Sequence, residues 1–408
     1  MSILFKNCAV LDTVKGELLP GHEVLVEGDT IREVSGRPIE APDAVVIDLG
    51  GRTLMPGLCD AHVHVTAIEA DLARLDRLSS SYITARSINV LSGMLRRGFT
   101  TVRDACGADQ GLAQAVRERV CEGPRLLCSG RAISQTGGHG DVRSPGEEAA
   151  DCGCSPKWAL SRIADGVGEV RRAARDELRK GASQIKIMVS GGVASPSDRV
   201  TNNQFSLEEI RAIVEEAEAA DTYVMAHAYT ARSIRRALEC GVRSIEHGNL
   251  IDGETLDLLK EKEAFLVPTL SVYEMAYRKG AESGIPQLML DKLGDLREKS
   301  LEALGMAMRK GVKVAYGTDL FGPLQEQQSL EFSLRRQACT PAEMIRSATV
   351  VCAELFNMKG RIGVIAPGAY ADLLAIDGDP LQSPELLQEQ GRYMSVIMKE
   401  GRFVLNRL

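Results

Sequence analysis

The sequence predicts an α/β protein: a (β/α)8 TIM barrel with a discontinuous β-sandwich domain built from both ends of the chain. Two observations predict this fold. Between residues 58 and 359, short apolar strands alternate with long amphipathic helical stretches, which is typical of repeated βα units and a parallel sheet. On both sides of this region, the pattern is that of strands. A doubly wound sheet is the structural alternative.

The segments 1–57 and 360–408 are expected to form the β-sandwich domain. Apolar or alternating runs separated by Gly and Pro predict short strands near the start of the chain. The closing segment returns to the same pattern from residue 363, and we expect it to pair with the first 57 residues. The early strands are predicted at 2–11, 22–27, 30–34 and 44–48.

Residues 58–359 are expected to form the barrel domain. Eight strand candidates lie in this region or at its edge, and helical patterns follow most of them. Eight βα units in roughly 250 residues or more is the size of a TIM barrel. The strand candidates are 54–65, 100–104, 125–129, 184–189, 223–227, 244–247, 265–269 and 312–319, and the helical patterns include 206–220, 288–310 and 341–356.

Composition excludes several classes of function. The net charge is −7, and no block of Lys or Arg is long enough to follow a phosphate backbone, so nucleic acid and membranes are not expected partners. The sequence has no signal-peptide pattern and no long apolar run, so we expect a cytoplasmic protein. The ten cysteines are scattered, which suits reduced thiols; Cys152 and Cys154 form one CxC pair without the second pair of a zinc site. We expect a small-molecule substrate and a homo-oligomer.

A pair of histidines is the first candidate for chemistry. His62 and His64 stand at i and i+2, so on an extended strand both side chains point to one face and can hold one metal ion. Four further groups lie at or near the ends of predicted strands. Because the carboxyl ends of barrel strands converge on one mouth, all six side chains are predicted to be neighbours. These four groups are Lys186, His227, His247 and Asp319.

Each of these residues could have a structural role instead of a metal-binding role. A lone histidine at a strand end is more often a satisfied polar residue than a ligand. However, five of the six histidines fall on the predicted rim, and His22 lies elsewhere. Lys186 stands between Ile185 and Ile187, and an unpaired buried ammonium is costly. This lysine therefore needs a partner or a modification.

Taken together, the motifs resemble the amidohydrolase superfamily, in the subgroup of imidazolonepropionase-like proteins and Xaa-Pro dipeptidases (prolidases). The resemblance covers nearly the whole chain. It rests on Leu54-Met-Pro-Gly-Leu-Cys-Asp-Ala-His-Val-His, on Gly98-Phe-Thr-Thr-Val-Arg-Asp, on the strands of Lys186, His227 and His247, on Gly317-Thr-Asp, and on the closing segment 360–376.

The resemblance implies a binuclear metal centre. Lys186 would carry a CO2-derived carbamate and bridge two divalent ions, expected to be Zn²⁺, with His62, His64 and Asp319 on one ion and His227 and His247 on the other. Carboxylation turns a costly buried cation into a bidentate anion. Two ions about 3.5–4 Å apart can bind a bridging hydroxide, which would attack the substrate. Asp319 would be the general base and then the general acid for the leaving amine.

The lysine also favours one reaction over others. Deaminases and imidazolonepropionases resemble the chain in the His62 and His64 pair but generally lack the bridging lysine. Many deaminases also place a Glu close to the histidine of strand five, whereas Ala-Tyr-Thr follows His227. We therefore expect an Xaa-Pro dipeptidase or N-acyl-amino-acid hydrolase, acting on a small dipeptide or N-acyl amino acid. A cyclic-amide hydrolase, hydantoinase-like or imidazolonepropionase-like, and a catalytically silent binding protein remain alternatives.

Loop residues are expected to bind the substrate. His139 lies in the Gly-rich stretch 134–156, and a donor there would stabilise negative charge on the scissile carbonyl oxygen. Tyr229 is two residues past His227 and is a candidate partner for a substrate carboxylate. Arg143 or Arg199 is the candidate for a bidentate ion pair with the same carboxylate.

Overall fold

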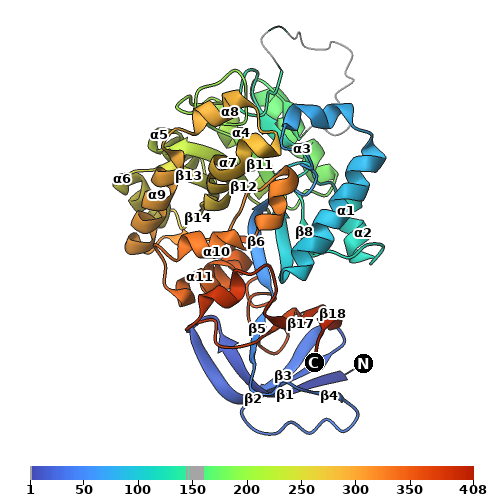
Figure 1. Ribbon diagram of the computed structural model, residues 1–408. Coiled ribbons are helices and arrows are strands. Elements are labelled where there is room, and N and C mark those ends of the chain that lie inside the picture. Colours follow the sequence, from blue (N-terminus) through green and yellow to red (C-terminus); the bar gives the residue numbers. More distant parts are fainter. Residues whose placement is uncertain (1, 144–145, 147–159) are drawn as a thin grey trace.

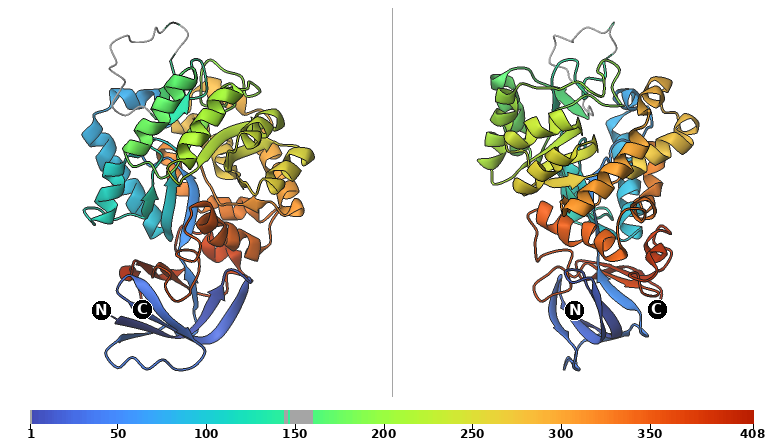
Figure 2. Two further views of the ribbon diagram at one scale, coloured as in Figure 1. Left: turned by 180° about the vertical axis from the view of Figure 1, so that it is seen from behind. Right: turned by 90° about the vertical axis from the view of Figure 1, so that its left-hand side faces the viewer.

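The computed structural model describes residues 2–143, 146 and 160–408. It is an α/β structure: helices surround parallel strands in the larger part of the molecule, and a sheet without such a cover lies at one end (Figure 1). The two further views show this sheet at the same end, close to both chain termini (Figure 2). The predicted α/β class is confirmed. Among the described residues, no helix has the length and apolar character needed to span a membrane.

Both ends of the chain contribute to one eight-stranded sheet, called here the terminal sheet. Its strand order is β18-β17-β16-β5-β1-β2-β3, with β4 paired to β1. The antiparallel pairing of β5 with β16 confirms that the closing segment returns to the first 57 residues. The strands are β1 (Ser2–Asp12), β2 (Glu17–Glu27), β3 (Thr30–Ser35), β4 (Val45–Asp48), β5 (Thr53–Pro56), β16 (Leu373–Ile376), β17 (Met394–Lys399) and β18 (Arg402–Asn406).

Alternation along β1 determines which side chains enter each apolar cluster of the terminal sheet. Ile3 and Phe5 pack in one cluster, which also includes residues of β16 and β17. Leu4 points to the opposite side and packs with Leu25 and Ile39. Successive side chains of a strand point to opposite faces, so both faces of β1 are covered.

The larger part contains two parallel sheets. One has the order β6-β7-β8 and the other the order β10-β9-β11-β12-β13-β14-β15. The parallel pair β9 and β10 was not expected from the sequence. The strands are β6 (Leu58–Val63), β7 (Phe99–Asp104), β8 (Arg125–Leu127), β9 (Ala132–Ser134), β10 (Ser161–Ile163), β11 (Ile185–Met188), β12 (Val224–Thr230), β13 (Ser244–Leu250), β14 (Phe265–Val267) and β15 (Lys313–Val314).

Helices follow most of the parallel strands, as expected. The α-helices are α1 (Ser80–Arg96), α2 (Gln110–Arg117), α3 (Val167–Arg179), α4 (Leu207–Glu218), α5 (Ala231–Glu239), α6 (Gly253–Glu261), α7 (Leu270–Ser283), α8 (Gln287–Leu293), α9 (Leu296–Lys310), α10 (Leu330–Arg335), α11 (Pro341–Ser347) and α12 (Val350–Leu355). Short 3-10 helices are η1 (Leu72–Arg77), η2 (Gly322–Gln327) and η3 (Pro384–Leu387).

Several predicted elements were wrong in extent; for example, the strand predicted over 312–319 is confined to β15. The strand predicted over 54–65 divides at Gly57 into β5 and β6, because β5 pairs with β16 whereas β6 pairs with β7; a Cβ at Gly57 would also lie 2.1 Å from Thr100 Oγ1, which favours glycine there. The chain passes there from the terminal sheet to the parallel strands. The helix predicted over 288–310 is interrupted at Gly294, where φ is 46° and ψ is −127°. The helix predicted over 341–356 is interrupted near Thr349, whose φ of −135° and ψ of −95° are not helical.

The helix predicted over 206–220 is α4, and its local sequence explains where it begins. Ser206 Oγ accepts a hydrogen bond from Glu209 N–H, and Glu209 Oε2 accepts one from Ser206 N–H. This capping box satisfies two backbone donors of the first turn. Ile210, Ile213 and Ala217 lie on one helical face and are buried. The apolar spacing thus directs one side of α4 into the core.

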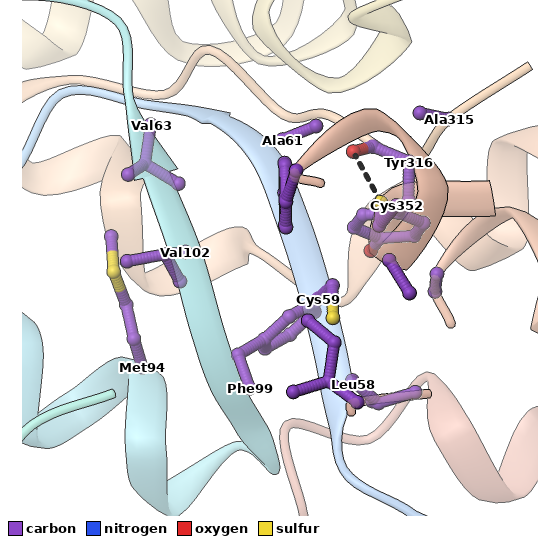
Figure 3. Close-up of a cluster of buried hydrophobic side chains, with 14 of the residues drawn as sticks. Leu58, Cys59, Ala61, Val63, Met94, Phe99, Val102, Ala315, Tyr316 and Cys352 are labelled. Atoms are coloured by element: carbon purple, nitrogen blue, oxygen red, sulfur yellow. Dashed lines mark hydrogen bonds between the residues drawn. The ribbon is translucent and has the colours of Figure 1, made fainter. Parts of the chain in front are cut away.

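Buried side chains from distant segments fix the strand β6 (Figure 3). Leu58 packs with Phe99 of β7, the ring centroids of Phe99 and Tyr316 are 5.5 Å apart, and Cys352 belongs to the same cluster. Cys352 Sγ lies 3.8 Å from the Tyr316 carbonyl oxygen. Because interiors are close-packed, this cluster limits the movement of β6. The packing of β6 therefore restricts the movement of the two histidines at its end.

Candidate metal centre

All six predicted metal ligands line one cavity at the carboxyl-terminal side of the parallel strands, and His139 and Tyr229 line it too. The cavity encloses about 120 Å³. β6 leads away from the terminal sheet, so the cavity lies on the far side of the parallel strands from that sheet (Figure 1). The six side chains are those of His62, His64, Lys186, His227, His247 and Asp319.

His62, His64 and Asp319 form the tightest group in the cavity. Asp319 Oδ1 lies 2.9 Å from His64 Nε2 and 3.3 Å from His62 Nε2. One ligand atom from each of the three residues lies within 4.8 Å of the other two. Burial alone would raise the pKa of Asp319, but His62 and His64 outweigh it and lower this pKa well below its usual range. The carboxylate is therefore charged and available to a cation.

Asp60, two residues before His62, fixes the strand of the two histidines to the segment that carries Asp319. Its Oδ1 accepts hydrogen bonds from the backbone N–H groups of His62 and Thr318, and its Oδ2 accepts one from Thr318 Oγ1. Asp319 itself has a φ of 57°, in the left-handed region. Its backbone N–H donates to the His62 carbonyl oxygen over 2.8 Å. These bonds hold Asp319 beside the histidines.

The buried ion pair of Glu246 and Arg103 supports the His62 ring. Glu246 Oε2 lies 2.6 Å from His62 Nδ1, and Arg103 Nη2 lies 3.0 Å from Glu246 Oε1. Burial raises the pKa of Glu246, but Arg103 and His62 outweigh it and lower the pKa to about 2. The charged carboxylate accepts the Nδ1 hydrogen of His62, which leaves Nε2 with a lone pair for a metal ion. Glu246 was not predicted from the sequence. The one feature that could have indicated its role is the position of an acidic residue within the apolar strand of His247.

The remaining histidines have the protonation state that a metal ligand needs. Burial lowers the pKa of His227 and of His247 well below the usual range. One ring nitrogen of each is already engaged: His227 Nε2 with the Gly191 carbonyl oxygen at 3.0 Å, and His247 Nδ1 with Thr269 Oγ1 at 2.8 Å. A neutral imidazole with one nitrogen held in this way offers the other as a ligand.

Lys186 lies in β11 and is 2% exposed. Among the residues that the structure describes, no carboxylate forms a direct salt bridge with its ammonium, and the charges of Glu246 and Asp319 only partly offset the effect of burial on its pKa. Burial is the main cause of a lowered pKa for Lys186. A buried amine without a counter-ion is costly as a cation. The cavity that contains this amine also contains three or more neutral or anionic side chains that can donate to a metal ion. This set of donors therefore fits divalent metal ions.

Two hydrogen bonds connect His139 to Asp198 through Ser195. Its Nδ1 lies 2.9 Å from Ser195 Oγ, and the Ser195 hydroxyl donates to Asp198 Oδ1. Its ring stacks on that of His227, with centroids 4.1 Å apart and planes 20° apart. Burial is the main cause that lowers the pKa of His139 to about 4. Ser195 and Asp198 were not predicted, and no motif marks them.

Tyr229 lies beside two of the predicted ligands. Its ring centroid is 4.6 Å from that of His227 and 5.3 Å from that of His247. The hydroxyl of Tyr273, which was not predicted, is 3.1 Å from the Tyr229 hydroxyl. The Tyr229 hydroxyl is thus positioned from a second element, α7.

The structure does not bring the two predicted arginines to the cavity. Arg143 Nε and Nη2 donate to Asp141, and Arg199 is exposed. Neither is among the described residues that line the cavity. Cys152, Cys154 and most of the stretch after Arg143 lie outside the described residues.

Comparisons with known proteins show which family this chain belongs to. A model of the amidohydrolase family matches residues 53–404. Ochratoxinase of Aspergillus niger is 34% identical over 348 residues, which are 82% of this chain and 72% of the relative. A solved prolidase complexed with N-methylphosphonate-L-proline has 47% identity and a TM-score of 0.98, covering 100% of both chains. A solved Xaa-Pro dipeptidase with bound methionine has 28% identity and a TM-score of 0.90, again over 100% of both chains.

Proposed function

This chain belongs to the amidohydrolase family, and on that premise we propose that it is a metal-dependent hydrolase that cleaves Xaa-Pro dipeptides or N-acyl amino acids. The observation that carries the proposal is the convergence of six potential ligands on one cavity around the buried, unpaired amine of Lys186. The similarity to a prolidase and to an Xaa-Pro dipeptidase supports the choice of substrate class.

The proposed cofactors are two divalent ions, Zn²⁺ in the first instance. His62, His64 and Asp319 would hold one ion, and His227 and His247 the other. The ions would supply Lewis acidity for the scissile carbonyl and acidify water. The donor geometry supports the first group directly, because its three ligand atoms lie within 4.8 Å of one another.

Lys186 is proposed to carry a carbamate formed with CO2. The lowered pKa of Lys186 favours the neutral amine, which is the form that reacts with CO2. The amine nitrogen attacks the carbon of CO2, one N–H proton leaves, and the product is an anion with two oxygen donors. This anion would bridge the two ions. The modification removes the unfavourable buried cation and supplies negative charge to a site of divalent cations.

Asp319 is proposed to move the proton during hydrolysis. Its Oδ1 lies 2.9 Å from His64 Nε2 and 3.3 Å from His62 Nε2, so it would be next to a water bound between these groups. The carboxylate takes one proton from that water and later gives it to the leaving nitrogen as the C–N bond breaks. The strong lowering of its pKa by His62 and His64 keeps it deprotonated at the start of the cycle.

His139 and Tyr229 are proposed to contact the substrate. Because the Ser195 hydroxyl hydrogen goes to Asp198, Ser195 Oγ accepts from His139 Nδ1–H. Because the pKa of His139 is lowered to about 4, the free ring is neutral at about pH 7. Donation from Nε2 requires a second proton that the ring would take up only as negative charge develops on the substrate oxygen; the Asp198 carboxylate would stabilise that imidazolium. Tyr229 would donate its hydroxyl hydrogen to the substrate carboxylate.

The finer architecture is also proposed. β6, β7, β8 and β11 to β15 would form one closed (β/α)8 barrel within residues 58–359, with residues 1–57 and 360–408 as a β-sandwich domain. Two backbone hydrogen bonds between the parallel sheets support closure. Ala61 N–H donates to the Tyr316 carbonyl oxygen, and Ser183 N–H donates to that of Cys128, both over 2.7 Å.

A substrate panel tests the proposed activity. Purified protein supplied with Zn²⁺ and bicarbonate is assayed against Xaa-L-proline dipeptides, N-acyl-L-prolines and other N-acyl amino acids, with hydantoins as the comparison class. We expect release of the carboxy-terminal amino acid. Turnover of hydantoins alone would replace the proposal by cyclic-amide hydrolysis, and no turnover of any class by metal-loaded protein would reject hydrolysis of these substrates.

A further inference from the structure

Helix α8 forms an apolar wall of the cavity. Met289, Leu290 and Leu293 all line the cavity and are half-buried, and no residue of α8 is fully buried. The helix begins after Pro286 and ends at Gly294, so residues that do not continue a helix bound it at both ends. Covering half-exposed apolar side chains with a ligand is favourable. A substrate group placed here would therefore be apolar.

The same wall continues on neighbouring elements. Val272 and Ala276 of α7 and Phe321 after β15 line the cavity next to the α8 residues. Among the described residues that line the cavity, the only Lys, Asp, Glu or Arg side chains are Lys186 and Asp319 of the metal centre. The cavity thus has a charged end for the reacting bond and an apolar end, which we call the α8 wall.

A lysine on α8 ties this wall to the loop that supports His139. Lys292 Nζ donates to the carbonyl oxygens of Ser195 at 2.5 Å, Asp198 at 2.7 Å and Gly192 at 3.3 Å. It also lies 3.5 Å from Asp198 Oδ1. The Lys292 side chain is 17% exposed. Hydrogen bonds from an ammonium are stronger than those between neutral groups, so this contact fixes α8 to the segment 191–198.

The segment 191–198 in turn fixes two rings of the site. Ser195 Oγ contacts His139 Nδ1, and the Gly191 carbonyl oxygen contacts His227 Nε2. At Gly192 a Cβ would lie 2.2 Å from His139 Cε1, so the backbone packs directly on that ring. A shift of this segment would move both His139 and His227.

We propose that Lys292 is a positioning residue that couples an apolar-substituent subsite on α8 to His139. The inference rests on the proposed hydrolytic function and names its substrate class: substrates whose acyl part carries a large apolar group. Such a group, seated on the α8 wall, holds α8 in place, and through Lys292 it holds the segment 191–198 and His139. Binding energy from a remote part of a substrate then serves to orient the reacting groups, which raises kcat as well as lowering KM.

Kinetics with two substrates tests the coupling. Four proteins are compared on N-acetyl-L-proline and N-(3-phenylpropanoyl)-L-proline: wild type, Lys292→Met, Lys292→Arg and the control Lys299→Met. Lys299 forms a salt bridge with Glu302 on the surface of α9. We expect wild type to have a kcat about tenfold higher on the larger substrate. Lys292→Met removes this advantage, Lys292→Arg restores part of it, and Lys299→Met keeps it. Equal losses on both substrates, or no loss, would overturn the coupling.

Hydrogen–deuterium exchange of the zinc-loaded proteins gives a readout that needs no turnover. Lys292→Met is expected to speed exchange in residues 191–204 at least about threefold, while Lys299→Met leaves it unchanged. If neither acyl-proline is hydrolysed, the N-acyl-proline part of the proposed function fails, and the exchange result still decides the role of Lys292. Unchanged exchange in Lys292→Met would contradict the positioning role.

Discussion

Glu246 Oε2 and His62 Nδ1 lie 2.6 Å apart in the buried interior, and Arg103 compensates the charge of the carboxylate. This contact fixes the His62 ring and assigns its Nδ1 hydrogen. The expected metal-binding face of His62 therefore depends on a residue that does not itself face the metal. Such supporting residues usually contribute substantially to metal affinity.

Glu246→Gln is expected to weaken zinc binding about 10- to 100-fold, because the amide no longer provides a charged acceptor for His62 Nδ1–H. Competition with a chromophoric chelator measures this affinity.

The matched control is Glu331→Gln, which breaks a second buried Arg–Glu pair, Glu331 with Arg335, away from the predicted ligands. Both variants lose stability, since each leaves a buried guanidinium unpaired, at a cost of about 3–5 kcal/mol. Only Glu246→Gln should lose zinc affinity. Equal affinities in the two variants would refute the supporting role of Glu246.

Zinc is expected to stabilise the folded protein through the cavity histidines. Adding Zn²⁺ to chelator-treated protein at about 100 times its dissociation constant should add about 2.7 kcal/mol to the free energy of unfolding. Thermal denaturation with and without the metal measures the effect. His22→Ala should show the full shift, because His22 is the one histidine of the six outside the described cavity lining. His62→Ala should lose most of the shift; a full shift there would argue against this site.

Asp319→Asn is expected to lower kcat about 10²- to 10⁴-fold, because an amide cannot take a proton from water. Zinc content is measured alongside, since Asp319 is also a proposed ligand. Asp257→Asn, which changes an exposed partner of Lys310, is the control and should keep wild-type kcat. A metal-loaded Asp319→Asn protein with normal kcat would exclude Asp319 as the proton carrier.

Asp198→Asn tests the relay behind His139. Loss of the carboxylate removes the charge that would stabilise an imidazolium at His139, so kcat should fall about 10- to 100-fold. Zinc content should stay at the wild-type level, because Asp198 is not a predicted ligand. Steady-state kinetics with metal analysis separates the two effects. Unchanged kcat would remove His139 protonation from the mechanism.

Much of the candidate site could be predicted from the sequence. His62 and His64 follow the two-residue period of a strand, and the carboxyl ends of parallel strands bring His227, His247 and Asp319 toward them. Lys186 stood out because charged residues rarely lie between two isoleucines of a buried strand. These inferences needed only local patterns and one general property of parallel sheets.

The rest depends on contacts between distant segments. Glu246 is recognisable as a supporting residue only when Arg103 and His62 are seen on either side of it. The division of the predicted strand 54–65 at Gly57 reflects a change of pairing partner from β16 to β7. Lys292 stands in an ordinary amphipathic stretch, and its acceptors lie about 100 residues earlier in the chain. No pattern in the sequence predicts these contacts.

The central claim is a carbamate on Lys186 that bridges two metal ions. The most direct measurement is ¹³C NMR of protein loaded with Zn²⁺ in ¹³C-bicarbonate, together with the metal content of wild type and Lys186→Ala. We predict a carbamate resonance and two ions per wild-type chain, and neither the resonance nor the second ion in Lys186→Ala. A wild-type protein without the resonance, or a Lys186→Ala protein that keeps both ions, would contradict it.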